Sequence, residues 1–488
     1  MTIITCTSCS HPYPQPGAPY RCSQCGGIFD QQNSLPFDPG QVEHQLPGIW
    51  RYRHTFPLPG GTPPVSLGEG NTPLVWAQAF GEKVAFKCEY QNPSGSFKDR
   101  GSATLLGFLA ARGVRQVVDD SSGNAGASFA AYAARAGMQA RVFVPDATSG
   151  PKRAQIEAYG AELVRIMGPR SNTTEAVRRA VEPGQVKDSE TVQEDDLPVY
   201  ASHAYLPFNL CGYATLAFEL YEQLAGAPGM VLIPVGQGGL LLGLGRGFKS
   251  LQQAGLIDRV PALVGVQVHS CAPLWALSTY GPAGLSWVSE GETLAEGIRV
   301  SKPVRGDAVM QMVAESQGSF LVVDEEEILP GRRELARRGF YVEPTSAVVW
   351  GALSQLAGKQ SGPVVVLSHR LWVERFSEDP AVVGRTLVIE GQTFEVLGVI
   401  PRSFRVHTSV EIGFWMLEGT VPGILPEELS PEAAIAQLAE GVSVEAARDE
   451  LNAVLVNNPL DRRADFGWIG LILTPGDLID PNLKQALL

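Results

Sequence analysis

The chain has 488 residues, 44% of them hydrophobic, and a formal net charge of −13. This length predicts two or more domains with sizeable cores, and the negative charge argues against nucleic acid and anionic membranes as partners. The apolar stretch at residues 240–244 is too short to span a bilayer, and the N-terminus lacks the basic-then-apolar pattern of a secretory signal. We therefore expect no membrane span and a cytoplasmic location.

Four of the seven cysteines form two CxxC pairs near the N-terminus, Cys6 with Cys9 and Cys22 with Cys25. Two such pairs can present four thiolates tetrahedrally to zinc. The alternative is two disulfides, which a cytosolic chain disfavours. We expect a zinc-ribbon-like segment over residues 1–35 with a structural role, because four thiolates leave no open position for water. The other three cysteines are scattered and are expected to be small core residues.

Short apolar or β-branched runs alternate with helical stretches along the body of the chain. Five of these runs are predicted strands, at residues 84–86, 140–144, 162–166, 230–234 and 263–268. The alternation favours an α/β fold with mostly parallel sheets. Ligands of such folds bind at the carboxyl ends of the strands, so we expect a site between two α/β units.

The segment NPSGSFKDRG, residues 92–101, places Lys98 in a loop of small and polar residues before a helix predicted over residues 102–112. Partial desolvation of a lysine lowers its pKa, and its neutral amine can then attack an aldehyde. The simpler interpretation is a surface lysine at a helix start, which holds for most lysines.

Two glycine-containing loops follow. The segment SSGNAGAS, residues 121–128, comes after a short apolar run and opens a helix of small residues. Its backbone N–H groups suit a carboxylate, and Asn124 can reach a ring oxygen. The segment PVGQGG, residues 234–239, follows the strand predicted at 230–234, and its glycines let the backbone approach a phosphate. Either loop alone is weak evidence, since many such loops only connect a strand to a helix.

The lysine loop and both glycine loops, in this order, predict that Lys98 holds pyridoxal phosphate as a Schiff base. Together with GEGNTPL at residues 68–74, these motifs resemble the threonine synthase family, pyridoxal-phosphate enzymes of the tryptophan-synthase-β group. The resemblance covers residues 1–368, and some lineages of that family carry a similar front ribbon. It implies a two-domain parallel-sheet fold over residues 36–368 and the conversion of O-phospho-L-homoserine and water to L-threonine and phosphate. It also suggests a homodimer.

The resemblance implies a role for each motif. Lys98 forms the internal aldimine and, once displaced by the substrate amine, takes the Cα proton as general base. Asn124 contacts the 3-hydroxyl of the cofactor, and Ser368 fills the hydroxyl position that meets the pyridine nitrogen. The cofactor phosphate is expected on Gly236, Gln237, Gly238 and Gly239. The substrate carboxylate is expected on the backbone N–H groups of Ser122, Gly123, Asn124 and Ala125.

A second anion site must hold the substrate phosphate. The cationic candidates, each of which is more simply interpreted as a solvated surface charge, are Arg100, Lys152, Arg153 and Arg170.

The character of the chain changes near residue 368. Residues 363–368 are predicted to form the last buried strand of the enzyme, but the glycine turn expected next in the family is absent. Residues 369–488 carry 9 Lys and Arg against 18 Asp and Glu, which is −9 of the total charge. Three segments of this tail are LSHRLWVERF, DPAVVGRTLVIEGQTFEVLGVIPRSFRV and LAEGVSVEAARDELNAV. They resemble part of the MacB-type periplasmic core domain of ABC exporter permeases, with a predicted hairpin over residues 386–400. We interpret the chain as a chimera joined near Ser368.

Two alternatives to a threonine-forming lyase stay open. The first is another pyridoxal-phosphate reaction on the same scaffold, either a serine/threonine dehydratase or a cysteate synthase. The second is a non-catalytic fusion protein, in which the tail is a transporter-derived interaction domain and the enzyme part is degenerate. The missing glycine turn leaves the final wall of the expected site altered, so catalysis is predicted to suffer more than cofactor binding.

Overall fold

The computed structural model describes residues 3–402, except residues 16, 122, 147–149, 169, 183–196, 360–363, 390–391 and 401, and it also describes residues 414–416. The chain divides into two compact units, Met1–Ala357 and Gly358–Leu488. The division therefore falls before residue 368, where the sequence places the junction.

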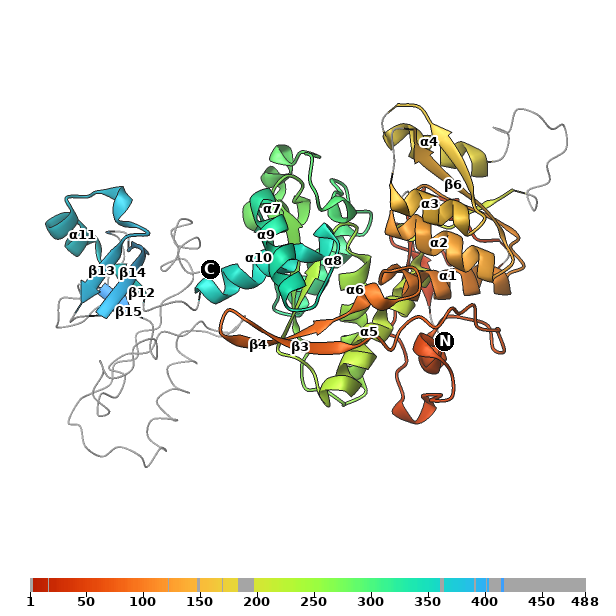
Figure 1. The fold of residues 1–488 in the computed structure, drawn as a ribbon, viewed down its shortest axis with the longest axis horizontal. Coiled ribbons are helices and arrows are strands. Elements are labelled where there is room, and N and C mark those ends of the chain that lie inside the picture. Colours follow the sequence, from red (N-terminus) through yellow and green to blue (C-terminus); the bar gives the residue numbers. More distant parts are fainter. Residues whose placement is uncertain are drawn as a thin grey trace. The chain divides into compact units, whose positions relative to one another are not determined.

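The first unit contains two parallel sheets. One has the strand order β7-β6-β5-β8, and every pairing in it is parallel. Its strands are β5 (Gln116–Asp119), β6 (Gln139–Pro145), β7 (Glu162–Ile166) and β8 (Val199–Tyr200). The helices that accompany this sheet (Figure 1) are α1 (Lys98–Ala111), α2 (Asn124–Arg135), α3 (Pro151–Ala158) and α4 (Arg170–Val181).

The other parallel sheet has the order β11-β10-β9. Its strands are β9 (Met230–Pro234), β10 (Ala262–Val268) and β11 (Ser319–Val323). The helices of this part of the unit are α5 (Leu210–Leu224), α6 (Gly239–Gln253), α7 (Pro273–Tyr280), α8 (Gly306–Glu315), α9 (Glu325–Arg337) and α10 (Pro344–Lys359). Glycines on α5 and α6 let these two helices approach closely, since a Cβ added to Gly247 would lie 2.4 Å from the carbonyl oxygen of Ala214.

Two antiparallel hairpins complete the first unit. Strands β1 (Ile4–Cys6) and β2 (Phe29–Gln31) form the N-terminal hairpin, and β3 (Leu74–Ala79) pairs with β4 (Glu82–Lys87). The short 3₁₀ segments described in the whole chain are Pro39–Gln41, Gly48–Thr55, Glu89–Gln91, Pro207–Asn209, Gly281–Trp287, Glu296–Ile298 and Pro380–Val382.

The second unit has its own sheet, of order β13-β14-β12-β15. Its elements are β12 (Val364–Leu367), α11 (His369–Phe376), β13 (Thr386–Ile389), β14 (Gln392–Val399) and β15 (Phe414–Met416). The strand predicted over residues 363–368 is present as β12, and among the described residues it pairs with β14 and β15. The apolar side chains that explain this pairing form one small core: Val365, Leu367, Val382, Phe394 and Val396.

All five strands predicted in the body of the chain are present as β4, β6, β7, β9 and β10, and the two main sheets are parallel as expected. The predicted hairpin over residues 386–400 is present as β13 and β14. The sequence also predicts helix starts at Ser430 and Ser443, and both lie outside the described residues. Among the described helices, none combines the length and the apolar character needed to cross a membrane.

Candidate active site

Lys98 is the first residue of α1 and is half-buried. Burial lowers the pKa of Lys98 to about 8, although the carboxylates of Asp119 and Glu343 oppose this shift. Its ammonium nitrogen lies 4.9 Å from the ring centre of Phe97. An amine with this pKa is substantially neutral near pH 8, which is the form that attacks an aldehyde.

The loop before Lys98 is tied to the first turn of its helix. Asp99 accepts hydrogen bonds from the backbone N–H of Ser94 at 2.7 Å and from the Ser94 hydroxyl at 2.5 Å. Gly95 has a φ of +91°, a conformation that favours glycine. These features explain why the small and polar residues of this segment are needed to present the lysine at a helix start.

The sequence suggested that Arg100 is a solvated surface charge, but the structure places it in the interior. Its guanidinium is fully buried and pairs with Glu89 at 2.7 Å and with Glu219 at 2.7 Å. Lys87 pairs with the same Glu219 at 2.8 Å. Because Arg100 is committed to two carboxylates, it is not free to bind a substrate phosphate. Its ion pair with Glu219 instead fixes α1 to α5, and Arg100 is only two positions after Lys98 in the sequence.

Asn124 begins α2 at the carboxyl end of β5. Its side-chain nitrogen lies 2.9 Å from both carboxylate oxygens of Glu343. Its side-chain oxygen is buried and has no hydrogen-bond partner among the described residues. The turn before α2 depends on Gly126, because a Cβ there would lie 1.7 Å from the carbonyl oxygen of Ser121.

The predicted carboxylate-binding residues Gly123, Asn124 and Ala125 are brought together at the start of α2, with Gly123 as its N-cap. Ser122 lies outside the described residues.

The GQGG loop joins β9 to α6. Gly238 has a φ of +78°, and a Cβ added there would lie 2.4 Å from Cγ2 of Val309 on α8. A Cβ on Gly236 would lie 3.0 Å from Cα of Ile298. The side-chain oxygen of Gln237 accepts a hydrogen bond from the backbone N–H of Val304 at 3.0 Å. Gly236 and Gly238 are buried, so the loop packs its backbone tightly against neighbouring residues at the N-terminus of α6.

Tyr213 of α5 connects the lysine helix to the glycine loop. A Cβ added to Gly101 on α1 would lie 2.5 Å from Cζ of Tyr213, and one added to Gly239 would lie 3.5 Å from Cε2 of the same ring. The ring of Phe97 also packs against Tyr213, with 5.3 Å between ring centres. The two motifs that are far apart in the sequence therefore share one buried aromatic side chain.

Glu343 is the residue of this site that sequence reasoning missed. It precedes α10 and bonds Asn124 from the other α/β part of the unit. The sequence offers one signal, a glutamate directly before a proline that starts a helix, and that signal does not indicate a site.

Ser368 lies in the second unit, where its hydroxyl accepts the N–H of Leu371 at 3.1 Å and caps α11. Its role beside the cofactor stays a prediction.

The four N-terminal cysteines form a second candidate site. Their Sγ atoms all lie within 4.8 Å of one another, and the distances of 3.4 Å, 3.5 Å and 3.6 Å between neighbours are far from a disulfide bond. Thiolates on a tetrahedral zinc lie roughly 3.8 Å apart. The remaining cysteines, Cys88, Cys211 and Cys271, are buried as expected.

The two cysteine pairs stand in equivalent loops. The N–H of Ser10 donates to the carbonyl of Cys6 at 2.9 Å, and the N–H of Gly26 donates to the carbonyl of Cys22 at 2.8 Å. Ser10 and Gly26 both have positive φ, 60° and 72°. The repeated turn points two pairs of sulfurs at one position, which is the arrangement that a tetrahedral metal needs.

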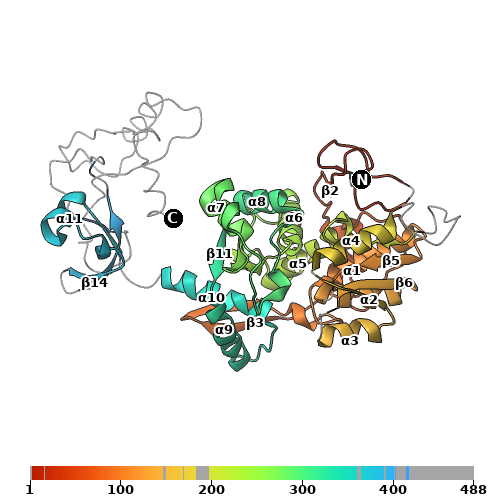
Figure 2. The ribbon, with the colours of Figure 1, turned by 90° about the horizontal axis from the view of Figure 1, so that it is seen from above.

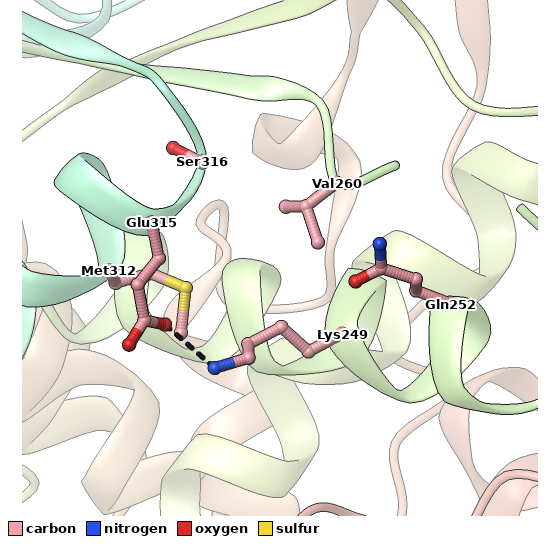
Figure 3. Close-up of a pocket in the computed structure, with 6 residues that line it drawn as sticks. All are labelled: Lys249, Gln252, Val260, Met312, Glu315 and Ser316. Carbon is pink, nitrogen blue, oxygen red and sulfur yellow. Dashed lines mark hydrogen bonds and ion pairs between the residues drawn. The ribbon is translucent and has the colours of Figure 1, made fainter. Parts of the chain in front are cut away.

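A pocket of about 180 Å³ lies elsewhere, between α6 and α8 (Figure 3). Its lining includes the ion pair between Lys249 and Glu315, 2.7 Å apart. Neither Lys98 nor the glycine loops line it, so it is separate from the candidate active site.

The first unit thus combines a half-buried lysine of lowered pKa with the N-termini of α2 and α6 at the carboxyl ends of parallel strands, a set of groups that suits a carbonyl compound with anionic groups. The chain belongs to the pyridoxal-phosphate dependent enzyme family, whose profile matches residues 65–369.

The relatives agree with this assignment. The chain is 29% identical to a threonine synthase of Methanosarcina acetivorans over 367 residues, which is 73% of this chain and 87% of the relative. It is 35% identical to a threonine synthase of Synechocystis over 327 residues, 65% of this chain and 80% of the relative. Maize serine racemase superposes with a TM-score of 0.50 and 22% identity, over 59% of this chain and 84% of that structure, which supports the fold.

Proposed function

We propose that the chain is a threonine synthase, a pyridoxal-phosphate dependent lyase that converts O-phospho-L-homoserine and water to L-threonine and phosphate. The observation that carries the proposal is Lys98, a lysine of lowered pKa that is influenced by Glu343, the hydrogen-bond partner of Asn124. Its helix α1 shares the ring of Tyr213 with the GQGG loop. Its relatives named threonine synthase, at 29% and 35% identity, are covered over most of their own length.

The residues fit pyridoxal phosphate. Lys98 supplies the amine for its aldehyde, and the GQGG loop supplies backbone N–H groups at the N-terminus of α6. The buried side-chain oxygen of Asn124 still lacks a partner among the described residues, as expected beside a polar ligand. When bound, the cofactor supplies an electron sink that stabilises negative charge at the substrate Cα.

Lys98 then acts as the base. With a pKa of about 8, its nitrogen takes the Cα proton without a large thermodynamic cost near neutral pH. Asp119 and Glu343 favour the protonated form, so they hold that proton on the lysine after transfer. The C–O bond at Cγ breaks and phosphate leaves as Cβ gives up a proton, and a proton then returns to Cγ to form the methyl group. Water adds its hydroxyl at Cβ, and the proton held by Lys98 returns to Cα, so that substrate and water give threonine and phosphate.

We propose that the substrate carboxylate binds the backbone N–H groups of Gly123, Asn124 and Ala125, because the N-terminus of α2 favours an anion. For the substrate phosphate we select Lys152. Its ammonium nitrogen donates to the carbonyl of Ser94 at 3.2 Å, beside the loop that carries Lys98, and it has two further donors.

We also propose that Cys6, Cys9, Cys22 and Cys25 hold one structural zinc ion. Their Sγ spacing and the two equivalent loops support this role. Four thiolates fill a tetrahedral shell, so the metal stabilises the segment and takes no part in the reaction.

The derivation of the tail from a MacB-type periplasmic core domain by gene fusion remains our proposal. The family match ends at residue 369, within the second unit, which begins at Gly358, and it leaves the rest of the tail unmatched. Limited proteolysis tests its independence: release of a fragment near residues 1–357 that retains pyridoxal phosphate supports it, and joint loss of both parts contradicts it. Homodimerisation and a cytoplasmic location stay predictions.

The function is tested by assaying phosphate and threonine release from O-phospho-L-homoserine, beside keto-acid release from serine and threonine. We expect phosphate and threonine in equal amounts and much slower keto-acid release. Rapid keto-acid release with no threonine would assign the chain to the dehydratases instead. A pyridoxal-phosphate-loaded chain that is inactive on all these substrates would favour the non-catalytic alternative.

A further inference from the structure

Asp30 links the cysteine segment to the catalytic part of the first unit. It lies on β2, and its carboxylate is almost fully buried. Arg246 contacts both carboxylate oxygens at 2.9 Å, and Arg305 approaches one of them at 3.1 Å. Burial alone would raise the pKa of Asp30, but these guanidinium groups outweigh it and lower the pKa.

The position of Asp30 depends on the cysteine segment. In the β1–β2 hairpin Thr5 is paired with Asp30, and the metal-site residue Cys6 is paired with Phe29. The carbonyl of Phe29 accepts a hydrogen bond from Arg305 at 2.9 Å. The positions of the Asp30 carboxylate and the Phe29 carbonyl therefore depend on how the segment folds around its cysteines.

The two arginines belong to the elements that shape the GQGG loop. Arg246 is on α6, the helix that begins in this loop at Gly239. Arg305 is the N-cap of α8, and its neighbour Val304 donates to the side chain of Gln237. Val309 of α8 lies against Gly238. Figure 2 shows β2 near α6, the helix that carries Arg246.

We propose that Asp30 is a positioning residue through which the cysteine segment, loaded with metal, holds the GQGG loop in the shape that binds the cofactor phosphate. The proposal rests on the function proposed above. It gives the N-terminal segment a role beyond stability: loss of metal weakens cofactor binding by releasing α6 and the start of α8.

The physical reason is the burial of Arg305. Its guanidinium is almost fully buried, and Asp30 is the carboxylate that faces it in the described structure. Without that charge the guanidinium must move toward water or accept an uncompensated position. Either change displaces Val304, which is bonded directly to the loop.

The test compares Asp30→Asn with Glu315→Gln. The control also removes a carboxylate that contacts α6 and α8, because Glu315 of α8 pairs with Lys249 of α6. This ion pair is exposed, whereas that of Asp30 is buried. For each protein, zinc content, the dissociation constant for pyridoxal phosphate and amide hydrogen exchange over residues 236–244 are measured. We expect Asp30→Asn to bind the cofactor about tenfold more weakly, within the usual range of coupling between sites, with faster exchange in that peptide.

Saturating pyridoxal phosphate should restore kcat in Asp30→Asn, which a general loss of folding would not allow. The same measurements on the wild-type chain, before and after zinc is removed with a chelator, need no variant to fold. We expect chelation to reproduce the weaker binding and faster local exchange.

Unchanged cofactor affinity and unchanged exchange in both Asp30→Asn and the chelated protein would overturn the proposal. The untreated wild type separates this from failure of the proposed function, since a wild type that makes threonine but is insensitive to both changes contradicts only the role of Asp30.

Discussion

The side-chain nitrogen of Asn124 lies 2.9 Å from each carboxylate oxygen of Glu343, a contact between residues 219 positions apart in the chain. It joins the start of α2 to the residue before α10 and places a carboxylate where it acts on Lys98. The two α/β parts of the first unit therefore both contribute to the environment of the lysine.

Replacing Glu343 by glutamine removes a charge that favours protonated Lys98. Burial already lowers the pKa of Lys98 to about 8, and without the opposing carboxylate the pKa falls further. The rate at which cofactor-free protein captures pyridoxal phosphate should therefore reach its midpoint at a lower pH. Glu326→Gln, an exposed position on α9, is the control and should leave the midpoint unchanged. An unaltered or higher midpoint in Glu343→Gln would show that the carboxylate does not act on the lysine.

Gly238→Ala is predicted to destabilise the protein and Gly239→Ala to be tolerated. The first combines a positive φ with a Cβ that would lie 2.4 Å from Val309, whereas the second places its Cβ 3.5 Å from Tyr213, an ordinary contact. We expect a loss on the order of 1–3 kcal/mol for Gly238→Ala and less than about 1 kcal/mol for Gly239→Ala. Urea denaturation of the cofactor-free proteins measures both. Equal midpoints for the two variants would contradict the packing described for the loop.

Arg100→Met should lower the thermal midpoint of unfolding more than the replacement of an exposed arginine does. It leaves Glu219 buried without its main counter-charge, which costs about 3–5 kcal/mol for a buried pair. Arg337→Met is the matched control, because Arg337 pairs with Glu334 at the surface, and its thermal midpoint should barely change. Similar midpoints for the two variants would mean that the buried ion pairs do not fasten α1.

The ion pairs of Glu219 with Arg100 and Lys87 also make the stability of the fold depend on pH in the acid range. Burial alone would raise the pKa of Glu219, but Arg100 and Lys87 outweigh it and lower the pKa to about 2. A carboxyl whose pKa is lowered by folding contributes stability above its unfolded pKa of about 4.3, and that contribution is lost as the pH falls toward 2. Stability should therefore decline between about pH 4 and pH 2. In Glu219→Gln this part of the decline should be absent, and an unchanged acid profile would contradict the assignment.

One zinc ion per chain is expected from elemental analysis of the purified protein. Cys22→Ser should lose it, because zinc prefers a complete set of four thiolates in a structural site. Cys271→Ala, which changes a buried cysteine outside the cluster, should retain it. Full zinc content in Cys22→Ser would show that the metal, if present, is bound elsewhere.

Local patterns predicted much of this molecule. The strands at Glu162–Ile166 and Met230–Pro234 match their predicted bounds, because β-branched runs between polar or glycine residues carry that signal within a few positions. The lysine loop and both glycine loops are likewise contiguous in the sequence, so their chemistry can be read without the fold.

Contacts between distant segments could not be predicted. The burial of Arg100 depends on Glu219, which lies 119 positions later in the chain. For this reason the sequence alone predicted a surface position for Arg100. Glu343 meets Asn124 only when the two α/β parts are assembled. The strand at Val364–Leu367 was recognised, but its apolar residues do not say which sheet it joins.

Borohydride reduction of the protein loaded with pyridoxal phosphate, followed by peptide mapping of wild type and Lys98→Ala, tests whether Lys98 carries the cofactor. We expect one pyridoxyl group per wild-type chain, on the peptide that contains Lys98, and none in the variant. A stoichiometric pyridoxyl group on a different lysine, or its retention in Lys98→Ala, would show that Lys98 does not hold the cofactor.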